Sequence, residues 1–330
     1  MIVATSKSAA LPLTLMELPS RALEPDEIRV SVRSIAVNPV DWKMRRGGPL
    51  RLAHRFIGPS GPLVVGVDFA GEISEIGPRV QAFAVGTRVV GATDFARKQL
   101  GSYASEVVVK EDQLAALPES LSFDDAACLP VAGATAHQAL IDFAHVDQKP
   151  GASVLILGAS GGVGLCTIQL ARKFGAKAVG VCSTTNVALV ESLGAKAIDY
   201  TRGDALAAAR SHGPYDLVLH AVGTLTYPLA ACRALLKPDG TVALVVQRVA
   251  DYFALATSRN VRGSLGRARS PVLEVLVAAA AAREITPIIE ATFPLGSAEL
   301  AHERSSAGKV VGKLLLHPSL GSGTIGEIVK

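Results

Sequence analysis

Cysteine is scarce in this sequence, with four residues among 330, and no two of them form a Cys-x-x-Cys pair. This spacing argues against a disulfide framework and against a structural zinc cluster. Each cysteine lies among apolar neighbours, at positions 128, 166, 182 and 232. We therefore expect buried thiols in a cytoplasmic protein.

Charge is also sparse. Charged residues make up 19% of the chain, the net charge is +4, and no nucleic-acid-binding motif is present, so nucleic acid is not an expected partner. The first 18 residues lack the basic start and apolar block of a signal peptide. The uncharged stretch 152–171 contains four glycines, which favour a buried strand, a turn and a helix over a membrane span.

The length and the changing pattern along the chain predict two domains. Residues 1–122 contain short strand-like segments with regular glycine breaks, which indicate a small, partly open barrel. From residue 123 to 285, strands alternate with helices, which predicts a Rossmann-type, doubly wound parallel sheet ending in a helix over 271–283. Residues 286–330 look β-rich again. We therefore expect an α/β protein in which 286–330 rejoin the first, β-rich domain.

A glycine-rich turn carries the strongest functional signal. Residues 158–164 read Gly-Ala-Ser-Gly-Gly-Val-Gly, after an apolar strand and before a predicted helix. Glycine lets the backbone approach a pyrophosphate, and the helix start offers unpaired amides. The alternative is a turn that only packs. We expect the turn to bind a dinucleotide through Gly158, Ser160, Gly161, Gly162, Val163 and Gly164.

The end of the second strand favours NADPH over NADH. An NAD enzyme usually carries an acidic residue there, but the segment contains Ser183, Thr184 and Asn186, with no acid before Glu191. Hydroxyls and an amide can donate hydrogen bonds to a 2′-phosphate, which an acid would repel. Because no basic residue lies in this segment, Tyr200 or Arg202 would supply a further contact. The alternative for the hydroxyls is helix capping.

The chain resembles the zinc-independent medium-chain dehydrogenase/reductase superfamily, in its quinone oxidoreductase and enone reductase branch. The resemblance implies a GroES-like first domain and a homodimer formed through a sheet edge. It places Thr135 at the nicotinamide, and we also expect Val222 and Lys309 to contact the cofactor. Six blocks in the family's order carry it: 37–43, 66–71, 129–136, the glycine turn, 198–201 and 308–313.

The chain departs from the alcohol dehydrogenase branch at the metal. That branch carries a zinc-binding cysteine where Asn38 stands and a His-Glu pair where Val67 and Asp68 stand. Neither Asn38 nor Val67 is a usual zinc ligand. We therefore expect no metal, and a zinc alcohol dehydrogenase is disfavoured.

Without a metal, hydrogen bonds must stabilise negative charge on the substrate. This suits hydride transfer from NADPH to the β-carbon of an enone or of an enoyl thioester such as enoyl-CoA, or to a quinone. The resemblance implies that Asn38 lines the pocket. We expect Lys43 to donate to the substrate oxygen, Asp41 to orient Lys43, and Tyr103 to donate a proton. The alternatives are an exposed ion pair of Asp41 with Lys43, and strand packing for Tyr103.

Two basic clusters and one rival function remain open. A cluster of this kind is usually a solvated face, but either could hold the phosphates of coenzyme A. A cofactor-binding sensor or partner-binding module with little catalysis is the main alternative to an enzyme. The clusters contain Lys43, Arg45, Arg46, Arg51 and Arg55, and Arg259, Arg262, Arg267 and Arg269.

Overall fold

The computed structural model describes residues 1–6, 11–246, 248, 250–264 and 266–318. The chain forms two compact units, one of residues 1–131 with 268–330 and one of residues 132–267. In the described part of the chain, no helix combines the length and the apolar character that crossing a membrane requires. All four cysteines are buried thiols, as expected.

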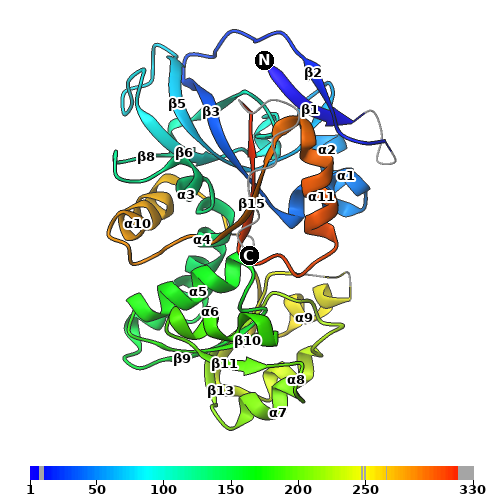
Figure 1. Ribbon diagram of the computed structural model, residues 1–330, viewed down its shortest axis with the longest axis vertical. Coiled ribbons are helices and arrows are strands. Elements are labelled where there is room, and N and C mark those ends of the chain that lie inside the picture. The colour runs from blue at the N-terminus through cyan, green and yellow to red at the C-terminus, as the bar shows by residue number, and fades with distance from the viewer. Residues whose placement is uncertain (7–10, 247, 249, 265, 319–330) are drawn as a thin grey trace. The chain divides into compact units, whose positions relative to one another are not determined.

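The first unit is built from both ends of the chain (Figure 1). Its larger sheet has the order β15-β16-β3-β5-β6-β8, with β7 also pairing with β3, and β2-β1-β4 form a smaller sheet. The C-terminal strand β16 lies antiparallel to β3, so the chain's last segment completes the N-terminal sheet. The strands are β1 (Ile2–Ser6), β2 (Thr14–Glu17), β3 (Glu27–Val37), β4 (Leu63–Val64), β5 (Asp68–Ile76), β6 (Arg88–Ala92), β7 (Glu106–Lys110), β8 (Leu114–Ala116), β15 (Ile289–Pro294) and β16 (Lys313–His317).

Among the described residues, five α-helices belong to this unit, and two of them are placed differently from our expectation. They are α1 (Pro39–Arg46), α2 (Pro49–Ile57), α3 (Phe123–Ala127), α10 (Ser270–Ala281) and α11 (Ala298–Ser306). We predicted α3 and α10 as parts of the Rossmann-type domain. Instead, α3 packs on β3 and β5, and α10 packs on β8 and on the turn just before it, where Ser270 Oγ donates to the Glu111 carbonyl at 3.0 Å. An apolar helix face packs on whichever sheet it meets, and sequence order does not decide that choice.

The second unit is the predicted doubly wound sheet. In the described part of the chain its six strands have the order β11-β10-β9-β12-β13-β14, and every neighbouring pair is parallel. The central strand β9 is buried over Val154–Leu157, as expected for a strand covered on both faces. The elements are β9 (Ser153–Leu157), β10 (Lys177–Cys182), β11 (Lys196–Asp199), β12 (Tyr215–His220), β13 (Leu236–Leu244), β14 (Val261–Gly263), α4 (Pro130–His137, beginning just before the unit), α5 (Gly162–Lys173), α6 (Val187–Ser192), α7 (Ala205–Arg210), α8 (Leu229–Arg233) and α9 (Asp251–Thr257).

Candidate active site

The glycine turn links β9 to α5, as the sequence predicts. Gly158 has a φ of +93°, which other residues rarely adopt. A Cβ on Gly164 would lie 2.3 Å from the Gly158 carbonyl oxygen, so only glycine lets the turn close on itself. A Cβ on Gly161 would meet only that oxygen, at 3.7 Å. Gly161 therefore faces open space at the start of α5.

The residues after β10 form a hydrogen-bonded cluster of polar side chains. Ser183 Oγ lies 3.0 Å from Thr185 Oγ1 and accepts from Asn186 Nδ2 at 3.2 Å. The Ser183 side chain makes no capping bond to the turn that it precedes. Ser183 and Asn186 are half-buried and Thr184 is exposed, so ligand atoms can reach them.

Asp199, which the sequence did not indicate as a site residue, lies beside this cluster. Asp199 ends β11, next to Cys182 in the sheet register, and accepts from Thr184 Oγ1 at 2.6 Å. It also accepts from the Thr201 hydroxyl at 2.7 Å and pairs with Arg202 at 3.2 Å. Its bonds with Thr184 and Thr201 lower the pKa of Asp199, so it is charged at neutral pH. The segment 183–186 itself contains no acid, but Asp199 of the neighbouring strand lies beside it, because adjacent parallel strands end side by side. The alternating strands and helices in the sequence predict a parallel sheet, and this pattern could have indicated that the ends of the strands lie side by side.

The other predicted cofactor residues fall into both units. In the second unit, Tyr200 and Val222 are 43% and 40% exposed, and the Val222 side chain lies next to Gly158. Thr135 is buried, and its backbone packs closely against Gly266. Lys309 lies in the first unit, is exposed and has a φ of +60°.

Asn38 stands at the centre of a buried polar network in the first unit. Its Oδ1 accepts from Lys313 Nζ at 2.6 Å, and its Nδ2 donates to Asp68 Oδ2 at 2.9 Å and to the Ala36 carbonyl at 3.3 Å. Lys313 Nζ lies 3.3 Å from Asp68 Oδ2. Asp68 Oδ1 accepts from the Val131 amide at 3.0 Å. Burial raises the pKa of Asp68, against the lowering effect of Lys313.

Asp41 and Tyr103 belong to a second buried network. Asp41 Oδ2 accepts from the Asn38 amide at 2.7 Å and from the Tyr103 hydroxyl at 3.2 Å. That hydroxyl lies 3.0 Å from His302 Nε2, and Arg45 contacts the other ring nitrogen at 3.4 Å. Because Arg45 can only donate, His302 carries its proton on Nε2 and donates it toward Tyr103.

Burial shifts the pKa values of this second network. It raises the pKa of Asp41 to about 7 and that of Tyr103 well above its usual value. It lowers the pKa of His302 to about 4. His302 was missed in the sequence because it lies 199 residues from Tyr103 in the chain.

The expected pairing of Asp41 with Lys43 is wrong. Asp41 is buried, whereas Lys43 is half-buried with its ammonium 5.5 Å from the centre of the Trp42 ring. Residues two apart on a helix point to different sides, so Asp41 cannot orient Lys43. Neither is Asp41 part of the exposed ion pair that was the alternative. Burial lowers the pKa of Lys43.

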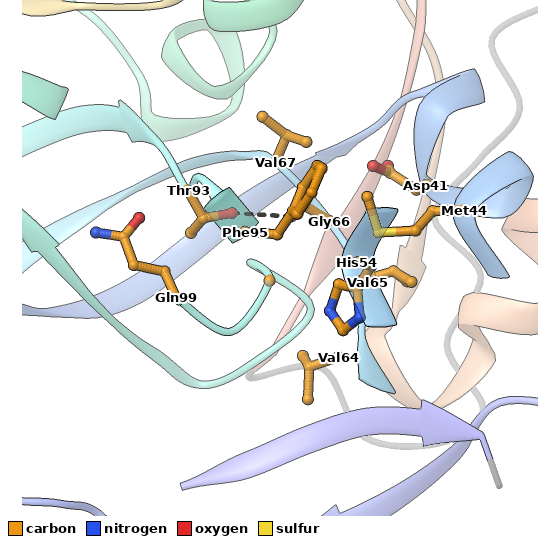
Figure 2. A pocket seen from close by; sticks show the side chains of 11 residues that line it. Asp41, Met44, His54, Val64, Val65, Gly66, Val67, Thr93, Phe95 and Gln99 are labelled. Carbon is orange, nitrogen blue, oxygen red and sulfur yellow. Dashed lines mark hydrogen bonds between the residues drawn. The ribbon is translucent and has the colours of Figure 1, made fainter. Parts of the chain in front are cut away.

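A cavity of about 20 Å³ lies in the first unit, close in size to one water molecule (Figure 2). Residues of α1 and α2 line one side, and the segment 93–99 lines the other. Asp41 Oδ1 is buried and has no hydrogen-bond partner among the described residues. Thr93 Oγ1 donates to the Gly66 carbonyl at 2.9 Å in the cavity wall.

Neither of the two basic clusters forms one continuous exposed surface, because some members are buried or paired with acids. In the first, Arg45 is buried and pairs with Glu299 at 2.8 Å, and Arg46 lies over the Trp42 ring. In the second, Arg269 pairs with Asp94 in the first unit at 2.9 Å. The remaining arginines of the second cluster are exposed in the second unit, at 259, 262 and 267.

A parallel sheet with a strand, an open glycine turn and a helix defines a dinucleotide-binding α/β protein. Comparison with known proteins agrees with this class. The alcohol dehydrogenase GroES-like domain family matches residues 24–119, and the zinc-binding dehydrogenase family matches residues 193–316. The 2-methylene-furan-3-one reductase of Solanum lycopersicum is 31% identical over 309 residues, covering 90% of this chain and 73% of that protein.

Solved structures place the likeness along nearly the whole chain. The quinone oxidoreductase from Coxiella burnetii has a TM-score of 0.84 and 30% identity, covering 96% of this chain and 98% of that chain. The quinone oxidoreductase of Escherichia coli, complexed with NADPH, has a TM-score of 0.78 and 25% identity, covering 96% and 99%. The chain belongs to the medium-chain dehydrogenase/reductase superfamily, in its quinone oxidoreductase branch, and is an enzyme of the oxidoreductase class.

One of the matching families is described as zinc-binding, but the residues here do not fit a zinc ion. Asn38 and Asp68 stand where the alcohol dehydrogenase branch carries a zinc-binding cysteine and the second residue of its His-Glu pair. Both side chains bond to the ammonium of Lys313. A cation is therefore already provided by the chain, and a second one would be repelled. Among the described residues, no group of three or more histidine, cysteine or acidic side chains could hold a metal.

Proposed function

We propose that this protein is an NADPH-dependent reductase of activated double bonds, with an α,β-unsaturated carbonyl compound or a quinone as substrate. The observation that carries the proposal is the buried network around Asn38. Asn38 stands where the alcohol dehydrogenase branch carries a zinc-binding cysteine, and it accepts a hydrogen bond there from the ammonium of Lys313. The names of the tomato reductase and of the two quinone oxidoreductases support the same substrate class.

Different residues of the chain are suited to binding the cofactor and to stabilising charge on the substrate. The cofactor supplies a hydride when bound. The turn around Gly161 is suited to hold its pyrophosphate, because the backbone there is open at the start of α5. The buried groups around Asn38 are suited to stabilise charge on the substrate oxygen, because hydrogen bonds are stronger where water is excluded. Tyr103 is fully buried between Asp41 and His302, so we assign it a positioning role.

A screen for turnover tests this proposal. The purified enzyme is mixed with NADPH or NADH and with quinones, enones or enoyl-CoA esters, while the absorbance of the reduced cofactor is followed. We expect NADPH oxidation with at least one of these classes. Tight NADPH binding without turnover across the panel would instead favour the cofactor-binding sensor.

The preference for NADPH has support and one opposing feature. The support comes from the hydroxyl and amide groups of Ser183, Thr184 and Asn186 and from the NADPH complex of the Escherichia coli relative. The opposing feature is Asp199, whose charge lies 2.6 Å from the Thr184 hydroxyl and would repel a 2′-phosphate. Arg202 partly compensates, because it pairs with Asp199.

The substitution Asp199→Asn is therefore expected to shift cofactor choice toward NADPH. Removing one carboxylate charge near the ribose should raise the ratio of kcat/KM for NADPH over NADH by roughly tenfold, equivalent to about 1.4 kcal/mol. Arg202→Gln should shift the ratio in the opposite direction. Glu191→Gln, an exposed acid on α6, serves as the control. An unchanged ratio in Asp199→Asn would show that Asp199 does not face the ribose.

A coenzyme A ester is a narrower version of the same proposal. The arginines at 259, 262 and 267 are exposed and could bind its phosphates, whereas Arg269 is already paired with Asp94. The test compares a crotonyl-CoA ester with its pantetheine ester at increasing salt. Equal activities that ignore salt would rule out phosphate recognition by these arginines.

We also propose a cytoplasmic homodimer. The buried thiols suit a reducing compartment, and β14 is an edge strand of the six-stranded sheet, which can pair with a second copy. Light scattering during size-exclusion chromatography measures the mass directly. A monomer at micromolar concentration would contradict the dimer.

A further inference from the structure

Three strands of the first unit bring Asn38, Asp68 and Lys313 together. Asn38 follows β3, Asp68 begins β5, and Lys313 begins β16. The sheet register aligns them, because Ala36 lies opposite Asp68 and Val37 lies opposite Leu314. Lys313 is 6% exposed and Asp68 is fully buried, so the charge pair lies inside the protein.

A count of hydrogen-bonding groups shows where this trio can still donate. The two protons on Asn38 Nδ2 are used by Asp68 and Ala36. The carboxylate of Asp68 has no proton to offer in the ion pair. An ammonium group has three N–H donors, and the contacts described for Lys313 Nζ are those to Asn38 and Asp68. The remaining donor of the trio is therefore the third N–H of Lys313.

We propose that Lys313 is the catalytic cation of this enzyme, and that its ammonium group binds the substrate oxygen on which negative charge develops. Asn38 and Asp68 then act as positioning residues that hold the ammonium in place. The inference rests on the proposed reductase function and extends it, because it replaces Lys43 with Lys313 as the donor to the oxygen. The fixed charge of the chain takes the role that a zinc ion has in the alcohol dehydrogenase branch.

The proposed step balances as follows. A hydride adds to the β-carbon of the substrate, the C=C electron pair shifts to form a double bond between the α-carbon and the carbonyl carbon, and the C=O electron pair moves onto the oxygen. The hydride would come from NADPH, and the positive charge that this leaves would be on its nicotinamide ring. Lys313 keeps its proton and stabilises the enolate oxygen, as a preorganised donor in a dry site does. A proton from water then adds to the α-carbon and gives the saturated carbonyl compound.

The rival explanation is that Lys313 only neutralises buried Asp68. A pair of variants separates the two. Lys313→Met leaves Asp68 buried without its partner, so stability and activity should both fall under either explanation. The double variant Lys313→Met with Asp68→Asn removes both charges. Under our proposal its Tm recovers, but its kcat stays about 100-fold below that of the unchanged enzyme, as when an oxyanion donor is lost. Its KM for NADPH should be unaffected.

Two further variants sharpen the comparison. Lys313→Arg keeps a positive charge and should restore part of kcat. Lys237→Met with Asp216→Asn removes another lysine–aspartate pair, joined at 2.7 Å in the second unit, and should leave kcat unchanged.

Recovery of kcat together with Tm in the Lys313–Asp68 double variant would overturn the catalytic role. An unmodified enzyme that turns over no quinone, enone or enoyl ester would overturn the proposed function itself. The two failures are therefore distinguishable in one set of assays.

Discussion

Asp41 and His302 lie on either side of the Tyr103 hydroxyl, at 3.2 and 3.0 Å, and burial shifts their pKa values in opposite directions. The pKa of Asp41 rises from 3.8 to about 7, so the folded protein holds this proton more tightly than the unfolded chain. Its contribution to stability is present below about pH 4 and is lost as the pH rises to about 7.

His302 acts with the opposite sign. Its pKa falls from 6.5 to about 4, so the folded protein disfavours the charged ring. Its contribution is missing below about pH 4 and is gained as the pH rises to 6.5. Each pKa unit corresponds to ~1.4 kcal/mol, so the contributions of Asp41 and His302 are on the order of 4 and 3 kcal/mol. In the unchanged protein the two largely cancel.

Single substitutions should reveal how each residue makes the free energy of unfolding depend on pH. Between pH 4 and 6.5, the free energy of unfolding of Asp41→Asn should rise with pH relative to the unchanged protein, because only the His302 contribution remains. In His302→Gln it should fall with pH. Urea denaturation at a series of pH values measures both slopes, and Asp147→Asn, an exposed acid, is the control. Parallel curves for all variants would contradict the assigned shifts.

At the scale of elements, the turn between β9 and α5 combines two kinds of glycine. Gly164 is required by the fold, since a Cβ there would lie 2.3 Å from a backbone oxygen. Gly161 has a φ of −79° and room for a Cβ, so its value to the protein is the open approach for a ligand. The sequence pattern cannot separate these roles, because both positions read simply as glycine.

Two alanine substitutions should therefore behave differently. Gly164→Ala should destabilise the protein by roughly 1–3 kcal/mol through overpacking. Gly161→Ala should keep its Tm but weaken NADPH binding by about tenfold, or 1.4 kcal/mol. Thermal melting without cofactor and calorimetric titration give the two quantities, with Gly203→Ala as an unhindered control. Equal loss of Tm in both variants would contradict this division.

At the scale of the whole molecule, α10 shows how the chain is shared between the units. Its buried residues Leu273, Leu276 and Val277 belong to the first unit, although the helix directly follows the second in sequence. All the described strands of the second unit's sheet lie within residues 132–267. A boundary after this helix would therefore detach an apolar face from its partner.

Fragments provide the corresponding prediction. Residues 132–267 should fold alone, with a circular dichroism spectrum of mixed helix and strand. Residues 132–285 should aggregate, because α10 would expose its apolar face. Size-exclusion chromatography of both fragments checks the result. A well-behaved longer fragment beside an aggregating shorter one would assign α10 to the second unit instead.

The sequence by itself determined the features whose signals are local. Neighbouring residues predict the strand, glycine turn and helix at 153–173 and the alternating pattern around them. They also predict the thiol state of the cysteines. The identity of Asn38 and Val67, which are not usual zinc ligands, can likewise be seen in the sequence alone. Each of these depends on short stretches of chain with fixed periodicity or spacing, which physical rules can interpret without a fold.

Only the tertiary structure decided which side chains meet. Lys313 and Asn38 are 275 residues apart, and Tyr103 and His302 are 199 apart, so sheet pairing and helix packing alone bring them into contact. Asp199 joins Thr184 because parallel strands end at one edge of a sheet. These long-range contacts fix the charges around the candidate site, because burial and partner choice, which set the energy of a charge, arise only when the chain is folded.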